Sequence, residues 1–235
     1  MISKLNRQPL DQVLFLDIET VPGVKSFDLL SDEMQQYYDD KTKYQRGEDV
    51  SAEEFYLQRA GILAEFGKVI CISCGFVHGT GEQREWRVKS FSGHDEKTVL
   101  QQFADMLHEN FPNKFTLLCA HNGFEFDFPY LSRRMLIHGV DLPDPLDNAG
   151  KKPWEIPHWD TMELWKFGDR KNFTSLKLLA ALFGIPTPKD DIDGSMVADV
   201  YYNENDLDRI VRYCEKDTKT VAQLIIAWRG EPLLD

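Results

Sequence analysis

The sequence predicts one α/β domain built on a mixed β-sheet with helices on its faces. Three strand-like segments come first in the chain, and helical and strand-like segments then alternate to its end. Hydrophobic residues make up 42% of the 235 residues, which is enough for a packed core and excludes a disordered chain. We therefore expect residues 1–235 to form a single domain.

Five segments have the apolar or alternating pattern of strands. They cover residues 13–18, 67–77, 85–91, 115–120 and 156–161. Four further segments have helical spacing of their apolar residues, a helix-ending glycine, or both. They cover residues 96–110, 128–138, 175–183 and 206–228. Residues 31–60 are polar and charged, and we expect them to form a helical insertion on the surface.

The composition bears on location and partners. The chain has 39 Asp and Glu against 27 Lys and Arg, and the difference gives a net charge of -12, which by itself disfavours binding to phosphates. No apolar run approaches the roughly 18 residues needed to cross a bilayer, and the N-terminus lacks the apolar core of a signal peptide. We expect a cytoplasmic protein without a membrane partner. Cys71 and Cys74, three apart on a predicted strand, point to opposite faces and are expected to be small core residues.

Two carboxylates stand at the end of the first predicted strand. Asp17 and Glu19 are two residues apart, so their side chains share one face of the strand. Burial and mutual repulsion both oppose the ionisation of such a pair, and a divalent cation bound between the carboxylates removes both penalties. The alternative is a strand end that meets solvent before a turn at residues 20–23.

The last predicted helix carries another carboxylate on its apolar stripe. Asp217 lies inside this stripe, and Tyr213 lies at its edge, one turn earlier. The apolar positions of the stripe are Leu207, Ile210, Val211, Cys214, Val221, Leu224, Ile225 and Trp228. A carboxylate among apolar groups is costly unless it is paired or bound to a metal. Asp217 is therefore a metal ligand, the partner of a nearby Lys or Arg, or an N-cap in another element.

Asp127 is the third candidate, and its local pattern is ambiguous. It follows the turn Asn122-Gly123 and precedes Pro129, which is typical of a helix start with Asp127 as the N-cap. Nothing local requires Asp127 to take part in chemistry.

Taken in order, the three sites resemble the motifs of the DEDD superfamily of 3'–5' exonucleases. The match consists of Asp-x-Glu on the first strand, Asn-x-x-x-Phe-Asp at a helix start and Tyr-x-x-x-Asp on the last helix, namely Asp17, Glu19, Asn122, Phe126, Asp127, Tyr213 and Asp217. The tyrosine is typical of the DEDDy branch. The resemblance extends from about residue 14 to 228 and is greatest to stand-alone bacterial exonucleases related to the proofreading domain of family B DNA polymerases.

The resemblance implies a ribonuclease H-like fold with a central mixed five-stranded sheet, and a mechanism with two Mg²⁺ or Mn²⁺ ions about 4 Å apart. Asp17 would contact both ions, Glu19 and Asp217 would complete the nucleophile-side site, and Asp127 would hold the leaving-group-side ion. Tyr213 would orient the attacking water. The implied activity is hydrolysis of phosphodiester bonds at the 3' ends of single-stranded nucleic acid, with release of nucleoside 5'-monophosphates.

Substrate contacts and structural roles compete at several residues near these motifs. We expect the terminal nucleotide to meet Ile18, Thr20, Asn122, Phe124 and Phe126. Aromatic rings can stack on an unpaired base, and core packing is the alternative for both phenylalanines. His121 and His158 lack the spacing of metal ligands, so we expect them to be hydrogen-bonded structural residues.

DNA is favoured over RNA as the substrate only by the likeness to polymerase domains. The alternatives are an exoribonuclease of the same fold and a non-catalytic nucleic-acid-binding module, although a binding module has no need for clustered carboxylates. The sequence indicates no particular replication or repair protein as a partner. Basic clusters at residues 133–134, 151–152 and 166–177 form either a solvated face or a groove that guides the strand, so the net charge does not exclude nucleic acid.

Overall fold

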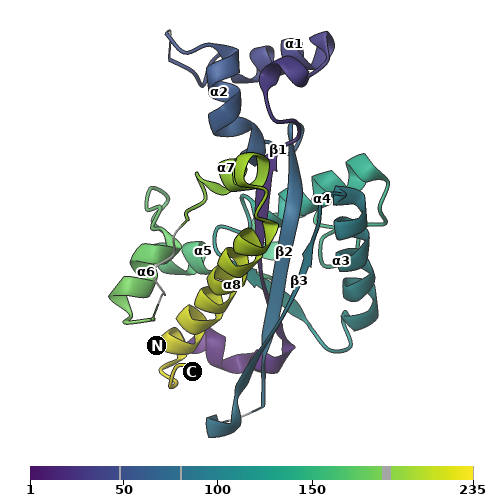
Figure 1. The fold of residues 1–235 in the computed structure, drawn as a ribbon. Coiled ribbons are helices and arrows are strands. Elements are labelled where there is room, and N and C mark those ends of the chain that lie inside the picture. Colours follow the sequence, from purple (N-terminus) through teal and green to yellow (C-terminus); the bar gives the residue numbers. More distant parts are fainter. Residues whose placement is uncertain (48, 80, 187–191, 235) are drawn as a thin grey trace.

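The computed structural model describes residues 1–47, 49–79, 81–186 and 192–234. Its centre is a five-stranded sheet with the strand order β3-β2-β1-β4-β5 (Figure 1). The order along the chain is β1 (Val13–Pro22), β2 (Gly67–His78), β3 (Glu85–Ser92), β4 (Leu117–Ala120) and β5 (Trp159–Asp160). The pairs β1–β2 and β2–β3 are antiparallel, and the pairs β1–β4 and β4–β5 are parallel. The predicted mixed five-stranded sheet is confirmed.

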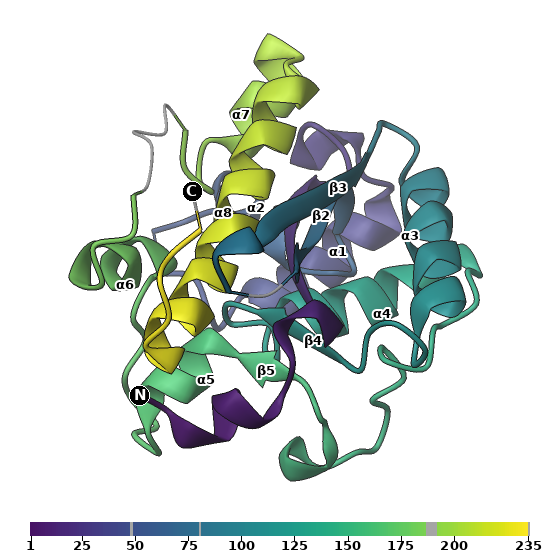
Figure 2. The same ribbon diagram turned by 90° about the horizontal axis from the view of Figure 1, so that it is seen from below.

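Helices cover both faces of this sheet. Helices α3 (Glu96–Asn110) and α4 (Asp127–His138) pack on one face. Helices α5 (Thr161–Lys166), α6 (Leu176–Leu182) and α8 (Leu207–Arg229) pack on the other, and Figure 2 shows the sheet between the two groups. The short α7 (Val197–Asp199) continues into a π-helical turn and packs against the end of β1.

The side chains of β1 point alternately to the two faces of the sheet. Leu14, Leu16 and Ile18 belong to the apolar core with α3 and α4, whereas Val13 and Phe15 belong to the core with α8. Because Asp17 and Glu19 continue the second series, their side chains lie on the α8 face. The period-2 rule therefore brings the first two acids beside the last helix.

The two neighbours of β1 differ in length, and this difference matters for the site. β2 pairs with β1 from Phe15 to Pro22, while β4 pairs with it only from Val13 to Phe15. Beyond Phe15, the β4 side of β1 has no strand partner among the described residues, and the chain that follows β4 fills this space. The chain that leaves β4 leads into α4, which begins at Asp127.

Residues 31–60 contain two helices, α1 (Asp32–Thr42) and α2 (Ala52–Arg59), beyond one end of the sheet (Figure 1). Ser31 and Ser51 cap them, and Ser51 forms a capping box with Glu54. The expected helices are present, but the segment is less polar in its packing than predicted. Tyr38 and Tyr56 are fully buried and meet edge to face, with ring centroids 5.1 Å apart. That this segment is an insertion into a single domain stays a prediction.

Several predicted boundaries were wrong. The strand expected over 156–161 is only the two-residue β5, because Asp160 caps α5, a helix that we did not predict. The strand expected from residue 115 begins at Leu117. Asp190 and Asp191, which contribute to the net negative charge, lie outside the described residues. Of the helices in the part of the chain that the structure describes, none is long and apolar enough to cross a membrane.

Cys71 and Cys74 point to opposite faces of β2, as predicted. Cys74 belongs to the core with α3 and α4, and Cys71 lies beside Cys214 of α8. Both are buried and neither forms a disulfide.

His158 is a structural residue, as expected. Its Nδ1 accepts a hydrogen bond from the backbone N–H of Leu118 at 3.1 Å, and its Nε2 donates one to the carbonyl of Pro145 at 2.6 Å. Burial, and to a smaller extent the charge of Lys151, lowers its pKa to about 4, because both disfavour the protonated ring. The neutral imidazole therefore ties the sheet to the loop that follows α4.

This tie predicts a pH dependence of stability. Since the pKa of His158 falls on folding to about 4, the unfolded chain binds more protons between pH 6.5 and 4. The free energy of unfolding should therefore decrease as the pH falls through this window. The variant His158→Gln keeps a donor and an acceptor but does not titrate. Between pH 7.5 and 5, the free energy of unfolding measured in urea should fall by about 2 kcal/mol more in the unchanged protein than in this variant. Identical pH profiles for the two proteins would contradict this account.

Candidate metal centre

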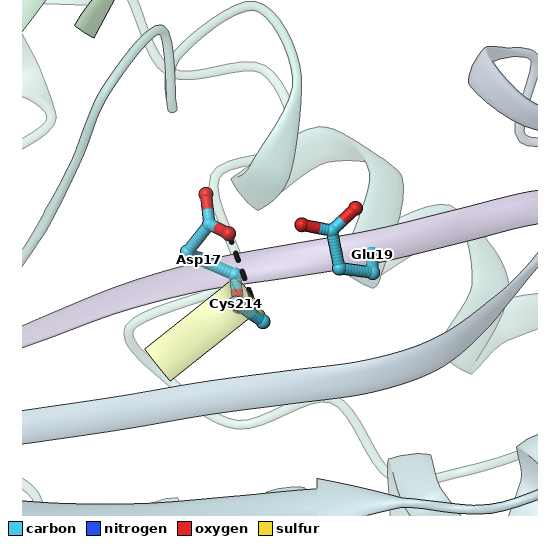
Figure 3. A group of neighbouring side chains, drawn as sticks. All are labelled: Asp17, Glu19 and Cys214. Atoms are coloured by element: carbon cyan, nitrogen blue, oxygen red, sulfur yellow. Dashed lines mark hydrogen bonds between the residues drawn. The ribbon is translucent and has the colours of Figure 1, made fainter. Parts of the chain in front are cut away.

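Asp17 and Glu19 extend from β1 toward the same side, and Cys214 of α8 lies beside them (Figure 3). One ligand atom from each of the three residues lies within 4.8 Å of the other two. The Sγ of Cys214 is 3.3 Å from the carbonyl oxygen of Asp17 and 3.4 Å from its Oδ2. The thiol therefore acts as a hydrogen-bond donor that fixes the position of Asp17.

Asp127 reaches the same site from α4. It is the first residue of the helix and is only 2% exposed, with Phe126 at the N-cap position, so the expected role of Asp127 as N-cap was wrong. Its carboxylate accepts a hydrogen bond from the backbone N–H of Ile18, which lies between the two acids of β1. This contact is possible because β4 ends before it would pair with that part of β1.

Helix α8 brings Tyr213 and Asp217. The helix begins after Asp206, whose side chain accepts the N–H of Arg209, and Gly230 ends it in the left-handed conformation. Asp217 is half-buried at the side of the apolar stripe, and Tyr213 shares a hydrogen bond with it. Both are close enough to the acids of β1 to influence their ionisation.

The four carboxylates repel one another in a poorly solvated place. Burial and the charges of Glu19, Asp127 and Asp217 raise the pKa of Asp17 well above its usual range. Burial and the charge of Asp217 also raise the pKa of Glu19 well above its usual range. Burial raises the pKa of Asp127 to about 8. Burial and the neighbouring acids also raise the pKa of Tyr213, so its hydroxyl keeps its proton at neutral pH. Such a group of carboxylates is stabilised by positive charge.

The donor set fits hard divalent cations. Burial raises the pKa of Cys214 well above that of a free thiol, and the nearby Cys71 and Asp17 act in the same direction. A protonated thiol is a poor metal ligand, so the oxygen atoms of the carboxylates remain. Oxygen-only sites suit Mg²⁺ and Mn²⁺ better than Zn²⁺.

Asp160 is a buried acid with a supporting role that the sequence did not reveal. Its carboxylate accepts four backbone N–H groups, two from Asn122 and Phe124 and two from Met162 and Glu163. These bonds hold the loop before α4 in a conformation in which Asn122 has φ of 62°. Asp160 thereby fixes the loop that ends at Asp127. The signal in the sequence was Asp160 followed by Glu163 three residues later, a helix-start pattern.

The residues predicted to contact substrate differ in their surroundings. The side chain of Ile18 is buried on the opposite face, with α3 and α4, so only its backbone is near the acids. Thr20 is half-buried and shares a hydrogen bond with Tyr130. Phe124 and Phe126 pack against the core, as the alternative interpretation expected. Asn122 lies at the turn described above, and substrate contact stays a prediction for all five residues.

His121, like His158, uses both ring nitrogens within the protein. Its Nε2 donates to the carbonyl of Thr174 at 3.1 Å, and its Nδ1 lies 2.9 Å from the hydroxyl of Thr161. Burial lowers its pKa to about 4. The predicted structural role of both histidines is confirmed.

Comparison with known proteins places this geometry in a family. Residues 62–222 match the model of a family described as a predicted 3'–5' exonuclease related to the exonuclease domain of PolB. The chain belongs to this family. The matched range includes Asp127, Tyr213 and Asp217, and the sheet brings Asp17 and Glu19, which precede that range, to the same site.

Two relatives illustrate the likeness. A DNA polymerase of Pyrococcus glycovorans is 22% identical over 142 residues, which are 55% of this chain and 18% of the polymerase. The family B DNA polymerase of the archaeon Pyrobaculum calidifontis has a similar fold, with a TM-score of 0.56 and 20% identity over 94% of this chain and 24% of that chain. This chain thus spans less than a quarter of either polymerase. The ribonuclease H-like fold expected from the sequence is confirmed.

The repulsion among the carboxylates predicts an unusual effect of Asp17→Asn. In EDTA at pH 8 the substitution removes a carboxyl group whose ionisation the folded protein opposes, so the melting temperature should rise by about 2–4 °C, as for a gain of about 1 kcal/mol. Added Mn²⁺ should raise the melting temperature of the unchanged protein and not that of the variant. Asp144→Asn, at an exposed loop position, is the control. Its melting temperature in EDTA and the rise on adding Mn²⁺ should equal those of the unchanged protein. A fall in melting temperature in EDTA for Asp17→Asn would contradict the repulsion.

Proposed function

We propose that this protein is a metal-dependent 3'–5' exonuclease that shortens single-stranded nucleic acid and releases nucleoside 5'-monophosphates. The observation that carries the proposal is the convergence of Asp17, Glu19, Asp127 and Asp217 from three separate elements. Membership of a family of predicted exonucleases supports it. DNA is the favoured substrate because the relatives are DNA polymerases. A cytoplasmic location stays a prediction from the sequence.

Each acid has a role in this proposal. Asp17 would hold both of two Mg²⁺ or Mn²⁺ ions, Glu19 and Asp217 would hold the one beside the attacking water, and Asp127 the one beside the leaving 3'-oxygen. When bound, two such ions supply hydroxide at neutral pH and stabilise the departing oxygen. The thiol of Cys214 keeps Asp17 in place, and Asp160 does the same for the loop that leads to Asp127.

Tyr213 would orient the attacking water. Its hydroxyl is protonated at neutral pH, because burial and the adjacent acids raise its pKa. It therefore serves as a hydrogen-bonding group and not as the base. Asp217 lies one helical turn after Tyr213, and the hydrogen bond between them fixes the position of the tyrosine ring.

A labelling assay tests the proposal directly. Single-stranded DNA and RNA of equal sequence, labelled at the 5' end, are incubated with Mg²⁺, Mn²⁺ or EDTA. We expect a ladder that shortens from the 3' end and disappears with EDTA and in Asp17→Ala. The control Asp144→Ala should behave as the unchanged protein does. Absence of cleavage of both polymers with both metals would refute the proposal, and cleavage of RNA alone would favour an exoribonuclease.

Tyr213→Phe separates water positioning from metal binding. Loss of the hydroxyl should lower kcat by about 10- to 100-fold while the affinity for Mn²⁺, measured by titration calorimetry, stays within about twofold. If activity and metal affinity fall together by the same factor, Tyr213 supports the metal site and has been misassigned.

A further inference from the structure

The connection between α5 and α6, residues 167–175, exposes aromatic rings where packing does not explain them. Phe167 is 76% exposed and Phe173 is 64% exposed. Phe167 also has φ of 47°, a left-handed conformation that costs a non-glycine residue free energy. Exposed phenylalanines in a strained connection contribute little to stability, so they suggest a binding role.

Cations accompany these rings. Residues 167–177 contain Arg170, Lys171 and Lys177 against the single acid Asp169, a net charge of +2 from 3 minus 1, in a chain whose total is -12. Lys166, just before them, is buried and paired with Glu163. Arg170 and Lys171 are exposed, and neither forms an ion pair within the described residues. The Nζ of Lys166 lies 4.5 Å from the ring centroid of Phe173, so Lys166 covers one face of that ring.

This segment contacts the loop before α4, and the helix that follows it packs against α8. At one side, the carbonyl of Thr174 accepts a hydrogen bond from His121, the residue before Asn122 in the loop that leads to Asp127. At the other side, Leu179 and Ala180 of α6 belong to the core that contains Val221, one helical turn after Asp217. Figure 2 shows α5 and α6 along the same face of the sheet as α8. The segment is therefore joined to the loop that leads to Asp127, and the helix that follows it packs with the helix that carries Asp217.

We propose that the α5–α6 connection binds the unpaired strand a few nucleotides from the end that is cleaved. Phe167 and Phe173 stack on bases, and Arg170 and Lys171 contact phosphates. Exposed rings interspersed with cations match the alternation of bases and phosphates in a single strand. In a duplex the faces of the bases are already stacked, so the surface selects unpaired nucleic acid. This inference deepens the proposed function and rests on it for the position of the cleaved end.

Binding measurements test the surface separately from catalysis. Anisotropy of a 5'-fluorescein-labelled 12-mer of thymidylate is measured in EDTA, so that cleavage does not interfere. Phe167→Ala/Phe173→Ala should weaken binding by about 30-fold or more, since stacking on each ring contributes a factor of about five or more. Arg170→Glu/Lys171→Glu should weaken binding at low salt and reduce the slope of log K against log salt by about 1.4, for two phosphate contacts.

A matched control lies on another part of the molecule. Tyr44 is 89% exposed and the Nζ of Lys43 lies 5.4 Å from its ring centroid, just after α1. Lys43→Glu/Tyr44→Ala removes one exposed ring and reverses one charge far from the α5–α6 connection, and it should leave binding unchanged. Equal weakening by this control, or no weakening by the variants of the connection, would overturn the inference.

Hydrolysis of a small substrate separates the two proposals. The p-nitrophenyl ester of thymidine 5'-monophosphate contains a single nucleotide, so under this inference it does not contact the connection. Both variants of the connection should hydrolyse it with Mn²⁺ as the unchanged protein does, while their KM for the 12-mer rises. A fall in ester hydrolysis equal to that on the 12-mer would overturn the inference, because the acid centre would then be disturbed. An unchanged protein that hydrolyses neither substrate refutes the proposed function, and the anisotropy result still decides whether the surface binds the strand.

Discussion

Repulsion among four carboxylates is the physical constraint on which the site depends. β1 contributes two of them by strand alternation, the start of α4 contributes the third and α8 the fourth. Their burial raises the cost of ionisation, and protein groups such as the thiol of Cys214 relieve it only in part. Cations are the natural counterpart of such a group. Under the proposed function, the free energy that the fold loses in assembling these acids would be recovered on metal binding.

The surrounding structure holds the acids together against this repulsion. Apolar cores on both faces of the sheet fix β1 between α4 and α8. Asp160 accepts four backbone N–H groups, two from the first turn of α5 and two from the loop before α4, and so joins these two segments. The early end of β4 leaves the N–H of Ile18 to Asp127. Rigid support of this kind lets carboxylates keep a geometry that they would not adopt in a flexible loop.

Regular elements made much of this arrangement predictable from the sequence. The face shared by Asp17 and Glu19 follows from the period of a strand, and the relation of Tyr213 to Asp217 follows from the period of a helix. The position of Asp127 was less predictable, because its contact with Ile18 depends on where another strand ends. Asp160 was missed as a support because its four partners lie in two segments far apart in the sequence. The net charge does not decide between partners, since four of the acids lie together at the candidate metal centre and basic residues are concentrated at 166–177.

The number of cations that the acids bind tests the central claim most directly. Free Mn²⁺ can be followed by electron paramagnetic resonance while the protein is titrated, in the presence of a nucleoside 5'-monophosphate. We expect two Mn²⁺ per chain in the unchanged protein, and Asp17→Ala should lose both, because Asp17 is the acid expected to contact both ions. Two ions retained by the variant, or none bound by the unchanged protein, would contradict the assignment of these carboxylates as a metal centre.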